Sequence, residues 1–305
     1  MTEPQWSEVR AVIVSYNPDL VRLTLVVESL RSQVESIVIV DNGSANEGAV
    51  SSLCDEFANV EFLGLSDNRG IGAALNVGVQ RSVAANPEWI LTMDQDTVVF
   101  EEGVASILAS FDSLAPQYRD RVGILAMRAH PQPSNIWITR YADRLLVINK
   151  LDKFEERRGV ITSGNLIRAD IARRASFDER LFIDQVDFDF CFVVRRLGYH
   201  VVIHDQISMD HVLGGRYGDT EKEHPYENAQ RVYYIIRNST FLVLRGRLLA
   251  RFYFVQMVVF CGAFVSMNGA RSLPLCCRVL LRAAVDAVTG RLGRREYPFL
   301  SRGRR

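Results

Sequence analysis

The chain has 305 residues, of which 48% are hydrophobic and 24% charged, and its formal net charge is zero. This length suits one sizeable α/β domain with an appendage, and the composition excludes a disordered chain, a collagen-like repeat and a polytopic membrane protein. Five cysteines without zinc-ligand or disulfide-scaffold spacing are typical of a reducing compartment. Since the N-terminal residues are polar and run straight into a strand-like segment, we expect a cytoplasmic protein.

The first hundred residues alternate β-branched apolar runs with amphipathic segments, which predicts parallel strands joined by crossover helices. Right-handed crossovers place such helices on both faces of a twisted sheet. The predicted strands cover 9–16, 36–41, 60–65 and 88–93, and the predicted helices cover 19–32, 47–57, 70–84 and 101–114. We therefore expect residues 1–100 to form a nucleotide-binding α/β half.

The first two predicted strands end in polar residues, Ser15-Tyr16-Asn17 and Asp41-Asn42-Gly43. In an α/β sheet, side chains at strand ends are placed to meet a base and a ribose. Asp41 can accept the N3–H of a pyrimidine, and Tyr16 can stack on the ring or bond to it. Asn-Pro and Asn-Gly also form ordinary turns, which explains Asn42 and Gly43 equally well.

A glycine-rich segment, DNRGIGAALNVG at 67–78, follows the third predicted strand and opens a helix. It differs from a dinucleotide-binding fingerprint because Leu75 occupies the last glycine position and the preceding strand is not the first. A nicotinamide-dependent dehydrogenase is therefore disfavoured. We expect the glycines to let the chain pass close to a diphosphate or the sheet, with Asn68 and Arg69 facing the donor.

Two carboxylates one residue apart, Asp94 and Asp96, directly follow the fourth predicted strand. Ligands collect at the carboxyl ends of strands in open α/β sheets, and carboxylate oxygens suit a hard cation such as Mg²⁺. The pair alone is a weak signal, because Asp96 can equally cap the following helix. Its place after a strand favours a metal and donor-phosphate site.

From about residue 122, shorter apolar runs and a Pro-rich loop at 130–135 predict a more irregular acceptor-side half over 101–240, with one clear helix at 185–197. Asp184, Asp187 and Asp189 lie at the start of that helix. The helix dipole favours acidic residues there, but three in six residues exceed what it needs. An inverting sugar transfer requires a carboxylate that takes the proton from the attacking hydroxyl, and Asp187 or Asp189 can serve.

Residues 241–305 are predicted to form an apolar, arginine-rich helical extension. Residues 237–305 carry thirteen arginines and only two acidic residues, a net charge of +11. The uncharged stretch 252–270 is at the lower limit for crossing a bilayer. Three alternatives are open: a helix on the inner-membrane surface with arginines toward anionic lipid, a helix packed on the catalytic domain, and a dimer contact. Nucleic acid is not expected as a partner.

Taken together, the motifs resemble the family 2 glycosyltransferases with a GT-A fold, especially bacterial rhamnosyltransferases. The resemblance covers roughly residues 9–240. It rests on SYNP, VDNGS, NRGIGAALNVG, MDQD, SGNLI, LFIDQVDFDF, the segment around His211 and RVYYIIRN, which occur in the family's order. It implies a mostly parallel, twisted GT-A sheet followed by the helical extension.

The resemblance also implies roles for individual residues. Asp41 would bind the donor pyrimidine, Asp94 would lie at the ribose or the metal, and Asp96 would bind Mg²⁺ or Mn²⁺, with His211 approaching the metal or the diphosphate. Asp187 would be the base, and Asp189 would position the acceptor or support the base. Val186 stands where the family has glutamate, as in rhamnosyl-transferring members. Gly164, Asn165, Tyr233 and Arg237 would contact the acceptor or the diphosphate.

The implied activity is inverting transfer of L-rhamnose from dTDP-rhamnose to a saccharide or polyprenyl-linked saccharide, in O-antigen or other cell-surface polysaccharide synthesis at the cytoplasmic face of the inner membrane. Another hexosyl or furanosyl donor is an alternative. A nucleotidyltransferase would need a basic, glycine-rich loop after the first strand, and SYNPD is neither. A non-catalytic membrane scaffold would have no use for both Asp96 and Asp187.

Overall fold

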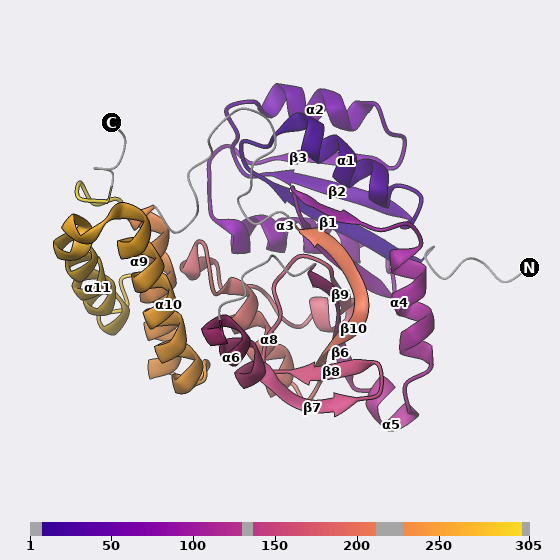
Figure 1. Ribbon diagram of the computed structural model, residues 1–305. Helices are drawn as coiled ribbons and strands as arrows, with labels where there is room; N and C mark the ends of the chain where they lie inside the picture. The colour runs from indigo at the N-terminus through magenta and orange to yellow at the C-terminus, as the bar shows by residue number, and fades with distance from the viewer. Residues whose placement is uncertain (1–7, 130–136, 212–227, 301–305) are drawn as a thin grey trace, which may run out of the picture.

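The computed structural model describes residues 8–129, 137–211 and 228–300 (Figure 1). The described strands form one ten-stranded sheet in the order β3-β2-β1-β4-β9-β6-β10-β8-β7, with β5 paired to β10. The first half confirms the predicted alternation. Its strands are β1 (Val9–Ser15), β2 (Ser36–Asp41), β3 (Val60–Gly64) and β4 (Trp89–Asp94), and its helices are α1 (Leu20–Leu30), α2 (Glu47–Asp55), α3 (Ile71–Val83) and α4 (Gly103–Asp112).

The central strands are apolar on both faces because each face carries a helical layer. In β1, Ile13 packs in one hydrophobic cluster with α1 and α4, whereas its neighbour Val12 packs in a second cluster with α3. Strands β1, β2, β3 and β4 are mutually parallel, as right-handed crossovers require. Their carboxyl ends therefore lie along one edge of the sheet, which carries the predicted nucleotide-binding residues.

The second half is mixed, as predicted, because β9 runs antiparallel between β4 and β6. Several elements differ from the sequence prediction. The apolar run RLLVIN is divided between the end of a helix and the start of a strand, and the last strand is longer than expected. The elements are β5 (Thr97–Val99), α5 (Pro116–Arg119), β6 (Val122–Ala129), α6 (Trp137–Leu146), β7 (Val147–Leu151), β8 (Phe154–Arg157), β9 (Asn165–Arg168), α7 (Ala169–Ala172), α8 (Val186–Arg196) and β10 (His200–His211). The predicted Pro-rich loop lies outside the described residues.

The C-terminal extension is helical, as predicted, and lies beside the sheet domain (Figure 1). It comprises α9 (Ala229–Leu244), α10 (Ala250–Asn268) and α11 (Leu273–Val288). The predicted boundary between residues 240 and 241 falls inside α9, which contacts both α10 and α11, so a division before α9 follows the structure more closely. Among the described helices, α10 has the length and apolar composition that crossing a membrane requires, and 11% of its most apolar window is buried.

Candidate active site

The predicted donor-binding strand ends lie side by side. Ser15 is in register with Asp41, and Val14 is in register with Asp94. The backbone N–H of Tyr16 donates a 2.7 Å hydrogen bond to Oε1 of Gln95, the residue between the two predicted metal ligands. The structure therefore joins the first strand end directly to the Asp94–Asp96 turn.

Asp41 is completely buried and already bonded within the protein. Its carboxylate accepts hydrogen bonds from the Ser15 hydroxyl at 3.1 Å and from both the N–H and the hydroxyl of Ser44, at 2.8 and 2.6 Å. These contacts fix the turn after β2. Direct bonding to a pyrimidine stays a prediction.

The exposed side chains at this edge are better placed to contact a donor than the buried Asp41. The side chains of Tyr16, Asn17 and Arg69 are exposed. Asn42 fixes the loop that carries Arg69. Its Oδ1 accepts a hydrogen bond from the Arg69 N–H at 3.0 Å, and its side-chain amide donates to Oδ1 of Asn68 at 3.2 Å. Asn68 thus orders the loop, while the Arg69 guanidinium faces solvent as a phosphate ligand would.

The Asp94–Asp96 turn is held by residues that the sequence did not single out. Arg22 of α1 is buried, and its Nε donates to the Asp96 carbonyl at 2.8 Å, while Nη2 reaches the Asp210 carbonyl at 3.3 Å. The Ser163 hydroxyl accepts from the Asp94 N–H at 3.0 Å. No spacing rule distinguishes an isolated arginine on an amphipathic helix, so only the fold reveals this contact.

The last strand ends beside the same turn. The backbone of His211 in β10 pairs with Thr97, the residue after Asp96, in an antiparallel ladder. The structure therefore brings His211 to the predicted metal position through its main chain, while its side chain lies outside what the structure describes. Strand β5, which makes this ladder, has three residues and carried no signal in the sequence.

Asp94 and Asp96 suit a divalent cation by the chemistry of their donors. Carboxylate oxygens are the ligands that Mg²⁺ and Mn²⁺ prefer, and Mg²⁺ takes most of its remaining ligands from water and substrate phosphates. Within the described residues, three or more His, Cys, Asp or Glu side chains do not gather in a metal-binding cluster. The two aspartates therefore fit a shared protein–phosphate site better than a closed protein cage.

Asp187 lies in the first turn of α8, and its half-buried carboxyl group has a strongly perturbed pKa. Burial and, to a smaller extent, the neighbouring carboxylates of Asp184 and Asp94 raise the pKa of Asp187 to about 7, against a hydrogen bond from the Phe188 N–H. The contribution of Asp94 to this rise places the Asp187 carboxyl group within electrostatic reach of the predicted metal-binding turn. A carboxyl group with a pKa near neutrality is suited to general base catalysis.

Asp189 is placed differently from the prediction. Its side chain is 2% exposed and forms a 2.9 Å ion pair with Nη1 of Arg247, which lies between α9 and α10. Burial raises its pKa, and the Arg247 guanidinium opposes that rise. A buried carboxylate engaged by an arginine of the extension is not placed to touch an acceptor. Its contact fastens the catalytic helix to the extension.

Gly164 and Asn165 form a turn that packs against the Asp94 strand. Gly164 has φ +78°, and a β-carbon there would lie 2.4 Å from the Met209 sulfur, so glycine is required. The Asn165 side chain is buried and donates to the Ile161 carbonyl at 2.7 Å. These two residues therefore build the turn, which differs from the predicted contact with the acceptor. In the same turn, the Ser163 hydroxyl accepts the hydrogen bond from the Asp94 N–H.

Tyr233 and Arg237 lie inside the extension, which corrects the prediction that they contact the acceptor or the diphosphate. Both side chains are fully buried. The Tyr233 hydroxyl donates to Asp286 at 2.6 Å, and Arg237 donates to the carbonyls of Leu181 and Gly293. Their polar groups are used within the protein, so buried hydrogen bonds explain these two residues of the motif RVYYIIRN.

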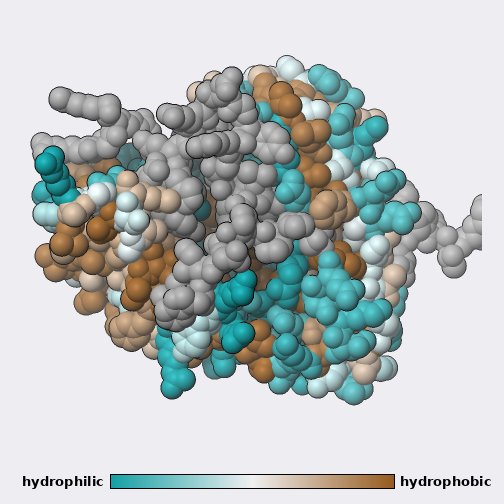
Figure 2. Space-filling view, in the orientation of Figure 1, coloured by the Kyte–Doolittle hydropathy of each residue, from teal (hydrophilic) through white to brown (hydrophobic). Residues whose placement is uncertain are grey.

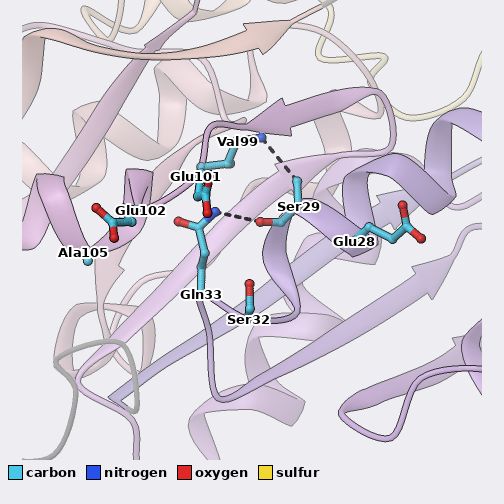
Figure 3. A pocket seen from close by; sticks show the side chains of 8 residues that line it. All are labelled: Glu28, Ser29, Ser32, Gln33, Val99, Glu101, Glu102 and Ala105. Atoms are coloured by element: carbon cyan, nitrogen blue, oxygen red, sulfur yellow. Dashed lines mark hydrogen bonds between the residues drawn. The ribbon is translucent and has the colours of Figure 1, made fainter.

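A cavity of about 600 Å³ lies between α1, the end of β5 and the start of α4 (Figure 3). Its walls carry three glutamates and the polar side chains of two serines and Gln33. The lining residues are Glu28, Ser29, Ser32, Gln33, Val99, Glu101, Glu102 and Ala105. None of the predicted donor, metal or catalytic residues is among them. An acidic surface of this kind repels a nucleoside diphosphate.

Comparison with known sequences agrees with this arrangement. The sequence profile described as "Glycosyl transferase family 2" matches residues 11–171, which extend from within β1 past the end of β9 and include the Asp94–Asp96 turn. This chain belongs to glycosyl transferase family 2. It is therefore a glycosyltransferase, and the donor-side geometry described above belongs to the matched segment.

Two curated relatives are similar over different lengths of this glycosyltransferase. The dTDP-rhamnosyl transferase RfbF of Shigella flexneri is 29% identical over 262 residues, which cover 83% of this chain and 86% of the relative. An N-acetylglucosaminyltransferase of Azorhizobium caulinodans is 31% identical over 35% of this chain and 26% of its own length. The first similarity includes the acceptor-side half and part of the extension.

Solved structures confirm the predicted GT-A fold. Residues 1–349 of TarS from S. aureus superpose with a TM-score of 0.52 at 14% identity, covering 93% of this chain and 81% of that one. GalNAc-T7 with UDP, GalNAc and Mn²⁺ superposes with a TM-score of 0.53 at 15% identity, covering 76% and 51%. At these identities the likeness concerns the fold alone.

Proposed function

We propose that this glycosyltransferase moves L-rhamnose from dTDP-rhamnose to a saccharide acceptor by an inverting, metal-dependent reaction. The observation that carries the proposal is the attachment of the loop before α8 to the donor-side start of α3, where the Ile71 N–H donates to the Phe182 carbonyl at 2.8 Å, together with the electrostatic effect of Asp94 on Asp187. The similarity to RfbF of Shigella flexneri supports the rhamnosyl donor. A different hexosyl or furanosyl donor is the alternative.

The residues divide into a leaving-group side and an acceptor side. Asp94 and Asp96 would hold Mg²⁺ or Mn²⁺, which when bound offsets negative charge on the departing nucleoside diphosphate. Arg69 contacts a donor phosphate from the adjacent loop. On the acceptor side, the ionised carboxylate of Asp187 takes the proton of the attacking hydroxyl, whose oxygen bonds to the anomeric carbon as the bond to the diphosphate breaks. Attack from the face opposite the diphosphate inverts the anomeric centre.

A panel of nucleotide sugars tests the donor assignment. With Mg²⁺ present, dTDP-rhamnose should bind, and it should be hydrolysed slowly when acceptor is absent, because water can replace the acceptor hydroxyl. UDP-glucose and dTDP-glucose should bind at least about tenfold more weakly, since a single lost polar contact in a sugar pocket costs roughly 1.4 kcal/mol. Calorimetry and product analysis measure both. Equal affinity for all donors would contradict the rhamnosyl assignment.

We further propose a lipid-linked saccharide acceptor at the cytoplasmic face of the inner membrane. Helices α10 and α11 carry an exposed apolar surface, visible at the side of the molecule where these helices lie (Figure 2). Its members on α11 follow helical spacing, and the most exposed are Phe254, Val258, Leu273, Leu281 and Val288. Apolar surface of this kind stabilises a complex when it is covered.

The charge of the extension favours an anionic bilayer over a second copy of the chain. Of its two acidic residues, Asp286 is buried against Tyr233 and Arg282, and Glu296 is paired with Arg294. Because a symmetric dimer places the same patch against itself, arginine would face arginine across it. Lipid phosphates instead attract the surplus arginines, each contributing about 1 kcal/mol near the surface.

Matched variants test this membrane contact. V288E, at 68% exposure on α11, should weaken binding to vesicles of mixed neutral and anionic lipid by about tenfold, because one valine leaves the apolar contact and a negative charge enters. V21E, at 74% exposure on α1, is the control and should bind like wild type. Flotation measures binding, and light scattering measures mass. Unchanged flotation for V288E, or a dimer that V288E dissociates, would overturn the proposal.

A further inference from the structure

The loop that leads into the catalytic helix is strained. Phe182, Asp184 and Gln185 all have positive φ, at 67°, 62° and 65°, although none is glycine. Such conformations are unfavourable and persist only where surrounding contacts enforce them. Helix α8 begins at Val186, and the Gln185 side chain makes no capping hydrogen bond. The start of the catalytic helix must therefore be fixed by other contacts.

Those contacts are made to the carbonyl groups of residues 181–184, here called the 181–184 carbonyls. The amide nitrogen of Asn238 in α9 lies 2.9 Å from the Leu181 oxygen, 2.8 Å from that of Ile183 and 2.9 Å from that of Asp184. The Phe182 carbonyl accepts from the N–H of Ile71 at 2.8 Å. All four carbonyls are thus engaged, and one side-chain amide serves three of them.

Asn238 is itself held in position. It is fully buried, and its Oδ1 accepts a 2.9 Å hydrogen bond from Nε of Arg237. The same guanidinium donates to the Leu181 carbonyl at 2.9 Å and to the Gly293 carbonyl at 2.7 Å, while the Gly293 N–H donates to the Arg180 carbonyl at 2.6 Å. Segments before and after α11 therefore meet at this loop, and the amide cannot rotate without breaking the network.

We propose that Asn238 is a positioning residue for sugar transfer, which holds the 181–184 carbonyls in their strained conformation and so places Asp187 against the donor-side turn. The inference rests on the proposed function, in which Asp187 is the base. It gives the extension a part in the reaction, because α9 holds the loop as far as Asp184, three residues before the base. Without Asn238, the carbonyls of Ile183 and Asp184 lose this donor, while the Leu181 carbonyl keeps its bond from Arg237, and the loop relaxes toward ordinary backbone angles.

Substitutions at Asn238 should lower kcat in proportion to the donors removed. N238A should reduce kcat by about 100-fold, since a displacement of about 1 Å at a reacting group has that effect, while donor affinity changes by less than about threefold. N238S keeps one hydroxyl donor and should retain intermediate activity. It provides the test of the proposal if N238A does not fold. The control is S239A, the adjacent buried residue of α9, whose hydroxyl faces Gln256 instead of the loop.

Steady-state kinetics, donor calorimetry and thermal unfolding are measured on all three full-length variants. The proposal predicts that N238A and N238S lose kcat with donor binding intact, and that S239A keeps kcat even where its Tm falls as much. Wild-type kcat in N238A, or a loss of kcat in S239A that matches its loss of stability, would overturn it. The proposed function fails separately, if D187N retains transfer.

Discussion

Replacing Asp187 with asparagine should lower kcat for sugar transfer on the order of 10³-fold, while the affinity for the donor changes little. The amide keeps the shape of the side chain but cannot accept the proton of the acceptor hydroxyl, and general base catalysis contributes roughly 10²–10⁴-fold. Rapid-quench transfer assays give kcat, and calorimetry gives donor affinity. Transfer at the wild-type rate would remove Asp187 from this role.

The pH dependence provides an independent check on the same residue. Because burial raises the pKa of Asp187 to about 7, wild-type kcat/KM should rise as pH increases through 7, where the carboxylate form becomes dominant. D184N is the matched control: it removes a neighbouring carboxylate that raises the Asp187 pKa, so the rise should move to lower pH with transfer retained.

The raised pKa also predicts an effect on stability. The folded state binds the Asp187 proton more tightly than the unfolded state, so the ionisation of Asp187 destabilises the fold as pH increases from about 4 to 7. D187N should therefore have a higher Tm than wild type at pH 8, by about 3 °C, and nearly the same Tm at pH 4. A lower Tm at pH 8 would contradict this electrostatic account.

Replacing Asp96 with alanine should reduce transfer by at least about 100-fold and weaken Mn²⁺-dependent donor binding. A carboxylate ligand is lost where charge develops on the leaving diphosphate, and such electrostatic stabilisation contributes about 10²–10³-fold per group. Chelation of the metal should lower the transfer activity of wild type and leave the residual activity of D96A nearly unchanged, because chelation and the D96A substitution remove the same interaction.

The control for D96A is D205A, which removes an exposed aspartate in β10, outside the predicted site. It should transfer like wild type and keep its full sensitivity to chelation. Equal loss in both variants would show that the effect comes from net charge. Undiminished metal-dependent binding in D96A would place the metal elsewhere.

The nucleotide-binding half was predictable because its signal is local. Runs of β-branched residues buried on both faces, such as VRAVIVS and SIVIVD, fit central parallel strands and little else. Strand β5 was not predictable, since three residues gain their structure only by pairing with β10, more than a hundred residues later. Helix α6 was hidden by the apolar run that continues from it into β7.

The residues of the site also divide into those that the sequence could predict and those that it could not. Asp94, Asp96 and Asp187 occur in motifs with distinctive spacing, and the Asp94 carboxylate contributes to the raised pKa of Asp187. Their supports were missed because Arg22 and Ser163 are single polar residues whose meaning depends on what the fold places beside them. Tyr233 and Arg237 show the converse error. Their motif resembles a functional segment, yet buried hydrogen bonds account for both side chains.

The most direct test is a crystal structure of the full chain with dTDP and Mn²⁺, with an anomalous map recorded for the metal. The account predicts one Mn²⁺ peak bonded to Asp96 and to the diphosphate, with the base near the end of β2 and Asp187 across the space where the sugar would lie. A nucleotide or Mn²⁺ bound elsewhere, for example in the acidic cavity between α1 and α4, or a diphosphate remote from Asp187, would contradict it.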